Sequence, residues 1–176
     1  LISSFSPAKW YNSHMSRAIN KVIVHCTASP DSMDVGAKEI RDWHVNGNGG
    51  SDIGYHWVIT NCYPTEAHYW NNQPDLAFDG AIHKGRSEQF RGAHVKGHNW
   101  ESVGVVMTGK RGFSSKQLYS AAKLCTLISS RFPHVEAVKG HCEFTDLKTC
   151  PDVDMDYFRK WVLPKVKIDY EAPETL

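Results

Sequence analysis

The sequence predicts an α/β fold: a single domain with a mixed central β-sheet flanked by helices. Two short β-branched runs, residues 21–26 and 103–108, are typical of buried strands. Apolar residues at helical spacing after Ser114 indicate an amphipathic helix. Residues 55–69 contain two candidate strands joined by a turn, which favours an antiparallel pair within the sheet. The chain of 176 residues has the length of one ordinary domain.

The first predicted strand, residues 21–26, ends at the turn-like segment Thr-Ala-Ser-Pro-Asp-Ser, so His25 is expected at its C-terminal end. Asp34 is a candidate N-cap for a helix that runs to about Val45. The glycine-rich residues 46–50 then stop this helix. Its apolar residues recur at helical spacing: Val35, Ile40 and Trp43.

The middle of the chain is predicted to hold a hairpin and long loops. Residues 55–60 form the second expected strand, residues 61–64 a turn, and residues 65–69 a third strand. Residues 71–101 are rich in Gly, Asn, Asp and Gln and have no clear period. Such segments are typical of long ordered loops that line sites. Residues 103–108 follow as another buried strand.

Ser114 with Gln117 three residues later forms a capping-box pattern at the start of the clearest helix. An extended piece at residues 136–139 then leads to His141, and Asp154 is a candidate cap for a last helix. The apolar residues expected on that last helix are Met155, Phe158 and Trp161. We therefore divide the chain into an N-terminal extension (1–19), one main domain (20–163) and a C-terminal tail (164–176).

Composition narrows the function classes. The formal charge is +1 and the sequence pI about 7.8, so nothing calls for a nucleic-acid or anionic-membrane partner. The longest apolar runs are too short to cross a bilayer, and the first residues lack a signal-peptide pattern. Five cysteines without a CxxC pair indicate reduced thiols rather than a disulfide framework. We expect a monomer, synthesised in the cytoplasm, without membrane insertion.

A split metal site is the strongest chemical signal. His25 ends a strand, and the distant segment 140–150 supplies His141 and Cys150 with Lys148 beside them. Two imidazoles and a thiolate leave a tetrahedral zinc ion one open position, as a hydrolytic site requires. Each residue also has a structural alternative, because a lone buried histidine is more often part of a hydrogen-bonded core. The combination favours metal-assisted hydrolysis.

Four blocks in a fixed order strengthen this interpretation. They are Val-Ile-Val-His25-Cys-Thr-Ala-Ser, Asp52-Ile-Gly-Tyr55-His-Trp-Val-Ile, Gly92-Ala-His-Val with Asn99 and Ser102-Val-Gly, and Gly140-His141 with Lys148-Thr-Cys150-Pro. On these blocks the chain resembles the zinc-dependent N-acetylmuramoyl-L-alanine amidases, which include phage endolysins and catalytic peptidoglycan recognition proteins. The resemblance spans roughly residues 20–161. It departs from the family pattern at residues 46–51, where an aromatic residue is often found.

The resemblance implies that His25, His141 and Cys150 are the ligands of a zinc ion (Zn2+). It implies catalytic roles for Tyr55 and Lys148. An ammonium group beside the metal can stabilise the oxyanion that forms on the scissile carbonyl. A phenol with an ordinary pKa near 10 suits a hydrogen-bond donor better than a base. The alternatives are a surface lysine and a core tyrosine.

By the same resemblance, His44, His94 and Asn99 line a groove that binds the muropeptide, and peptidoglycan is the substrate. The alternative for these residues is hydrogen bonding in loops and core. Cys26 and Cys142 adjoin predicted ligands but are expected to be structural thiols, since neighbouring strand side chains point to opposite faces. Glu143 is expected to be a surface carboxylate.

The predicted function is hydrolysis of the amide between N-acetylmuramic acid and L-alanine in peptidoglycan by zinc-activated water. The preferred setting is a phage-type endolysin that acts on the cell wall after cytoplasmic synthesis. One alternative is a noncatalytic module that binds peptidoglycan. The other is a zinc peptidase that cleaves the stem peptide.

Overall fold

A five-stranded mixed sheet organises the protein, in a computed structural model that describes residues 17–166. The strand order is β3-β2-β4-β1-β5, and all neighbours are parallel except the antiparallel pair β2 and β3. This confirms the predicted fold class, a mixed central sheet flanked by helices. The strands are β1 (Lys21–Cys26), β2 (Trp57–Ile59), β3 (Ile82–Lys84), β4 (Ser102–Met107) and β5 (Ala137–Gly140).

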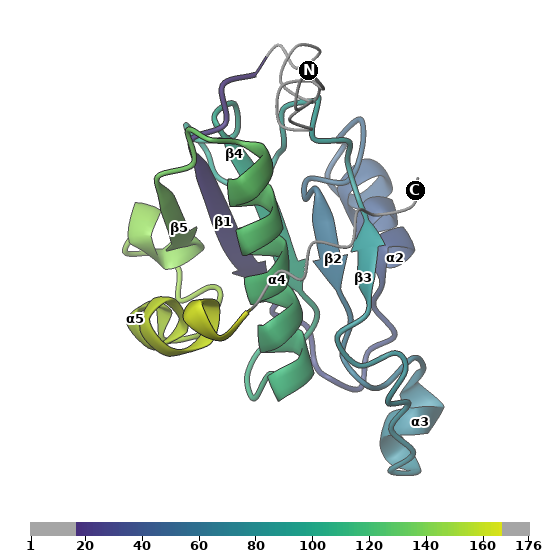
Figure 1. The fold of residues 1–176 in the computed structure, drawn as a ribbon. Helices are drawn as coiled ribbons and strands as arrows, with labels where there is room; N and C mark the ends of the chain where they lie inside the picture. The colour runs from purple at the N-terminus through teal and green to yellow at the C-terminus, as the bar shows by residue number, and fades with distance from the viewer. Residues whose placement is uncertain (1–16, 167–176) are drawn as a thin grey trace, which may run out of the picture.

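The long helix α4 (Ser115–Arg131) lies along one face of the sheet, as Figure 1 shows. Ser114 caps it as predicted, because its Oγ accepts the Gln117 N–H while Gln117 Oε1 accepts the Ser114 N–H. The other helices are α2 (Ala37–Asp42), α3 (Glu66–Trp70) and α5 (Met155–Tyr157). Single helical turns occur at Trp43–Gly47, His141–Phe144, Phe158–Val162 and Leu163–Lys165.

Strand alternation divides the core between the two faces of the sheet. Val103, Val105 and Met107 of β4 pack in the cluster that contains the buried residues of α4. Val106 belongs to the opposite cluster, with Ile40 of α2. His25 is paired with Val106 in the parallel register and therefore points to the α2 face. The candidate site lies on that face.

Two predicted elements differ from the structure. The predicted cap Asp34 is wrong: helix α2 begins at Ala37 after Gly36, whose N–H donates to Glu39 Oε2 at 2.9 Å. Residues 65–69 are not a strand but a helical turn, because Thr65 Oγ1 accepts the His68 N–H and starts α3. The antiparallel partner of β2 is instead Ile82–Lys84, within the segment predicted as loops.

The ends of the described segment are part of the packed domain. Arg17 and Ile19, within the predicted N-terminal extension, are 4% and 2% exposed, and Val166 is 9% exposed. The division at residues 19 and 163 stays a prediction, and most of both flanks lies outside the described residues. No helix within residues 17–166 is long and apolar enough to cross a membrane. All five cysteines lie in this range and are free thiols.

Candidate metal centre and active site

Three side chains from distant parts of the chain meet at one point. They are His25 at the end of β1, His141 directly after β5, and Cys150 in the following loop. One ligand atom from each lies within 4.8 Å of the others. Because β5 pairs with β1 in parallel, the strand ends place His141 beside His25. The predicted ligand set is thus brought together by the sheet topology.

His25 is completely buried and is held through both ring nitrogens. Its Nδ1 lies 3.8 Å from Cys150 Sγ, and its Nε2 lies 3.0 Å from His94 Nδ1. Burial, with the nearby His94 and His141, lowers the pKa of His25 well below its usual range. The ring is therefore neutral near pH 7, as a metal ligand must be.

His141 is half-buried, and its ring centroid lies 4.8 Å from that of His25. Burial and then the positive charge of Lys148 lower the pKa of His141. The turn that carries His141 is capped by Glu143, whose Oε2 accepts the Gly140 N–H at 2.7 Å and a bond from Arg159 at 2.9 Å. Glu143 is therefore committed to the backbone and to a surface ion pair.

Cys150 is tied to the end of β1. Its Sγ accepts the Cys26 N–H at 3.2 Å, and its carbonyl accepts the Cys142 N–H at 2.7 Å. A hydrogen bond with the Cys26 thiol and burial raise the pKa of Cys150. A thiolate at this position therefore requires a cation beside it. Neither Cys26 nor Cys142 belongs to the ligand group, and their role as structural thiols stays a prediction.

The three donors fit a zinc ion. Zinc bonds of about 2.0–2.1 Å to nitrogen and about 2.3 Å to sulfur place tetrahedral donor atoms about 3.4–3.6 Å apart. The observed separation of 3.8 Å between His25 Nδ1 and Cys150 Sγ is close to that value. Two imidazoles and one thiolate form the three-ligand set of catalytic zinc sites, which keep a fourth position open.

Tyr55 lies beside this group. Its ring centroid is 5.0 Å from that of His25 and 5.5 Å from that of His44. Burial, with a further contribution from Cys150, raises the pKa of Tyr55 above its usual range. The phenol therefore stays protonated near pH 7, and its catalytic role stays a prediction.

Lys148 is exposed and stands two residues before Cys150. Its charge contributes to lowering the pKa of both His25 and His141, so the ammonium acts electrostatically on the ligand group. This placement is compatible with its predicted role beside the metal. An exposed ammonium stays free to meet a substrate.

The three predicted substrate-binding residues differ in their surroundings. Half-buried His44 accepts the Gly54 N–H at Nδ1, 2.8 Å away, which leaves Nε2 as a donor. His94 is only 8% exposed and contacts His25. Asn99 Oδ1 accepts the N–H groups of His94 and Val95, each at 2.8 Å. Substrate binding by these residues stays a prediction.

Two structural residues of the site were missed from the sequence. Arg17 donates to five backbone carbonyls of residues 88–102, the segment that carries His94. His56 is fully buried next to Tyr55, and its Nδ1 accepts the Gly104 N–H at 2.9 Å. His56 directly follows Tyr55 in the block Asp52-Ile-Gly-Tyr55-His-Trp-Val-Ile, so its position could have indicated a role in the site. Nothing in the local sequence around Arg17 indicated its role.

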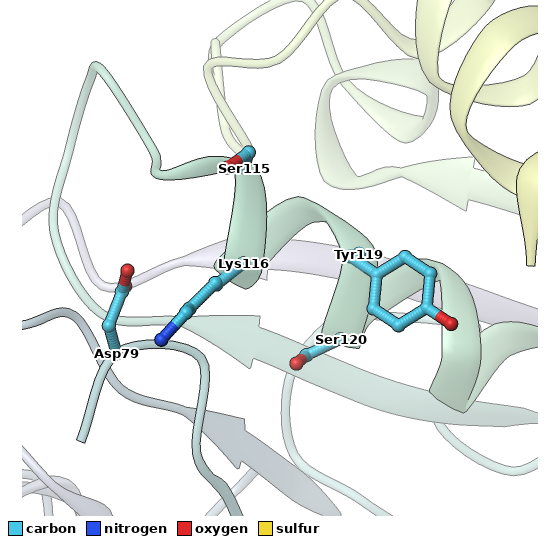
Figure 2. A pocket seen from close by; sticks show the side chains of 5 residues that line it. All are labelled: Asp79, Ser115, Lys116, Tyr119 and Ser120. Carbon is cyan, nitrogen blue, oxygen red and sulfur yellow. The ribbon is translucent and has the colours of Figure 1, made fainter. Parts of the chain in front are cut away.

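A separate hollow on the surface of α4 is not part of this site. Figure 2 shows its five lining residues, with the Lys116 side chain of α4 extending toward Asp79. They are Asp79, Ser115, Lys116, Tyr119 and Ser120. It lies by α4, which packs on the opposite face of the sheet from His25. Its two charged groups make hydrogen bonds within the protein: Asp79 accepts from Ser114 Oγ, and Lys116 Nζ donates to the Leu76 carbonyl.

Comparison with known proteins agrees with this geometry. The family described as N-acetylmuramoyl-L-alanine amidase matches residues 15–153. The endolysin of Klebsiella phage KP32 is 30% identical over 150 residues, which cover 81% of this chain and 84% of that protein.

Two solved structures share the fold. The amidase LysC of Clostridium intestinale URNW has a TM-score of 0.65 at 21% identity, covering 85% of each chain. Bumblebee PGRP-SA has a TM-score of 0.63 at 25% identity, covering 84% of each chain. The family match spans most of the sequence and all of the residues in the ligand group. The chain belongs to the N-acetylmuramoyl-L-alanine amidase family.

Proposed function

We propose that this protein is a zinc-dependent peptidoglycan amidase of the phage endolysin type. It hydrolyses the amide between the lactyl group of N-acetylmuramic acid and L-alanine. The observation that carries the proposal is the ligand group of His25, His141 and Cys150, whose donor atoms lie within 4.8 Å of one another. Family membership and the endolysin relatives support the same reaction.

Each side chain beside the ligand group has a proposed role in the reaction. When bound, zinc supplies a Lewis acid that acidifies water and polarises the scissile carbonyl. Lys148 brings a positive charge to the developing oxyanion, a contribution of a few kcal/mol for one well-placed donor. Tyr55, kept protonated by its burial, donates a hydrogen bond to the reacting oxygen atoms. His44 offers its Nε2–H to the substrate, since its Nδ1 is occupied.

The polar groups of the predicted groove match those of peptidoglycan. Two of the predicted groove residues, His44 and Asn99, present an imidazole and an amide group, which match the hydroxyls and amides of a muropeptide. We propose cytoplasmic synthesis followed by action on the cell wall, in a monomeric state. Sedimentation of the purified protein at several concentrations tests the monomer, and a mass that rises with concentration would contradict it.

The first experiment is digestion of purified peptidoglycan with and without a chelator, followed by zinc add-back. Mass spectrometry should find stem peptides that begin with a free L-alanine amino group, released only when zinc is present. Cleavage at D-amino-acid bonds would indicate a zinc peptidase instead. Binding without cleavage would indicate a recognition module, a role compatible with the similarity to PGRP-SA.

A matched pair of cysteine variants makes this test specific. Cys150→Ser removes the thiolate from the ligand group, and we expect it to lose zinc and cleavage together. Cys62→Ser changes a free thiol outside that group and should retain both. A fully active Cys150→Ser protein would contradict the proposed ligand set.

A further inference from the structure

The environment of His94 differs from that of a groove residue. The ring is 8% exposed and stands edge-on to His25, with the two ring centroids 5.0 Å apart. Its Nδ1 lies 3.0 Å from His25 Nε2, the nitrogen that points away from Cys150. On its other side, Nε2 lies 3.4 Å from Ser102 Oγ. The ring therefore bridges a predicted metal ligand and strand β4.

The hydrogen bonds along this row have a single consistent direction. If His25 binds the metal through Nδ1, its proton resides on Nε2 and is donated to His94 Nδ1. His94 then carries its own proton on Nε2, facing Ser102 Oγ. Ser102 Oγ in turn donates to the His98 carbonyl. Each atom has one role, and the row ends at a backbone acceptor.

The sheet provides a niche for the His94 ring. Ser102 and Gly104 alternate on the same face of β4 as Val106, the face that His25 shares. A Cβ added at Gly104 would lie 2.8 Å from His94 Cγ and Cδ2. A side chain at position 104 would therefore displace the imidazole. This explains a glycine inside a buried strand, where it otherwise weakens packing.

The backbone of His94 is also fixed. Asn99 Oδ1 accepts the N–H groups of His94 and Val95. Arg17 anchors the same loop through the carbonyls of Phe90, Asn99 and Ser102, among others. Loop, strand face and hydrogen bonds thus all constrain one imidazole against His25.

We propose that His94 is a positioning residue that fixes the tautomer and ring orientation of His25 for metal binding, through the row His25–His94–Ser102. This inference rests on the proposed zinc site. Partners of this kind on a ligating histidine raise its basicity, and their loss costs about 10- to 100-fold in metal affinity or activity. His94 acts on the metal through His25 rather than on the peptidoglycan.

The test is zinc affinity, measured by competition with a chromogenic chelator and independent of substrate. His94→Leu should bind zinc about 10- to 100-fold more weakly than the unchanged protein. His94→Asn should recover much of that loss, because its Oδ1 can accept the His25 Nε2–H in place of Nδ1. His134→Leu removes an exposed imidazole after α4 and serves as the matched control with unchanged affinity.

A second variant tests the niche without altering His94. Gly104→Ala should weaken zinc binding to a similar degree, whereas Gly47→Ala, where an added Cβ meets nothing within 4 Å, should not. In the zinc-loaded protein, 15N-resolved NMR should place the His25 proton on Nε2, and His94→Leu should make that proton exchange faster. These readouts separate positioning from a merely structural role.

The outcomes are distinguishable from those of the amidase test. Folded His94→Leu protein with the zinc affinity of the unchanged protein would overturn the positioning role and leave the amidase proposal intact. Zinc binding that depends on His94, without any peptidoglycan cleavage, would refute the amidase and support the positioning role. Absence of zinc binding by the unchanged protein would overturn both.

Discussion

Replacement of Arg17 by Met should destabilise the whole domain. The guanidinium is 4% exposed and donates to the carbonyls of Glu88, Phe90, Asn99, Trp100 and Ser102 at 2.5–3.0 Å. The Phe90 carbonyl keeps a second donor, His56 Nε2 at 3.1 Å. Each buried acceptor left without a donor costs about 1–3 kcal/mol, so the other four at the lower limit give about 4 kcal/mol. That is close to the lower end of the total stability of a typical domain, about 5–15 kcal/mol.

Urea unfolding followed by tryptophan fluorescence measures this effect. With an m-value of about 2 kcal/mol per M, a loss of about 4 kcal/mol lowers the midpoint by about 2 M. Arg17→Lys keeps the charge but not the planar five-donor fork, so it should recover less than half of the loss. The matched control is Arg41→Met, since Arg41 makes an exposed ion pair with Asp52. That pair is worth at most about 1 kcal/mol.

A small shift would refute the reasoning. If Arg17→Met lowers the midpoint by no more than Arg41→Met does, the carbonyls of Glu88, Asn99, Trp100 and Ser102 find other donors when the guanidinium is removed. The loop of residues 88–102 would then be held by its other contacts, including those of Asn99.

Three further predictions concern the site. Lys148→Ala should keep zinc but lower turnover about 100- to 1000-fold, as measured by peptide release, because one oxyanion donor is lost. Zinc uptake near pH 7 should release about one proton, which comes from the Cys150 thiol. The pKa of Cys150 is raised, whereas the two histidine ligands are already neutral. Calorimetry in buffers of different ionisation enthalpy measures the number of protons released. The free energy of unfolding of the metal-free protein should fall on acidification below pH 6.5, because burial lowers the pKa of His56 to about 4.

The sign and size of the acid effect follow from linkage. His56 stays neutral in the folded protein, so its contribution is complete above the unfolded pKa of 6.5 and is lost as the pH falls toward 4. At about 1.4 kcal/mol per pKa unit the contribution is roughly 3 kcal/mol. A free energy of unfolding that is constant from pH 7 to pH 4 would contradict the His56 prediction. Zinc uptake without proton release would contradict the prediction for Cys150. Unchanged turnover of the Lys148→Ala protein would contradict the prediction for Lys148.

Local sequence patterns were sufficient where residues close together in the chain set the structure. Ser114 and Gln117 predicted the start of α4, since a capping box involves only neighbouring residues. The β-branched run at residues 21–26 predicted β1 and placed His25 at its end. The same patterns failed at Thr65, where local capping made a helical turn of a segment whose aromatic residues suggested a strand.

The sequence by itself determined the fold class, the main strands and the residue types of a metal site in the order of a known family. Tertiary structure decided which histidines share a point in space. The parallel pairing of β1 with β5 brings His25 to His141, across more than a hundred residues of chain. The tertiary structure also brings Arg17 into hydrogen-bonding contact with the loop that carries His94, and it leaves space for the His94 ring beside Gly104. Such contacts depend on register and on the face of a strand, which no local pattern encodes.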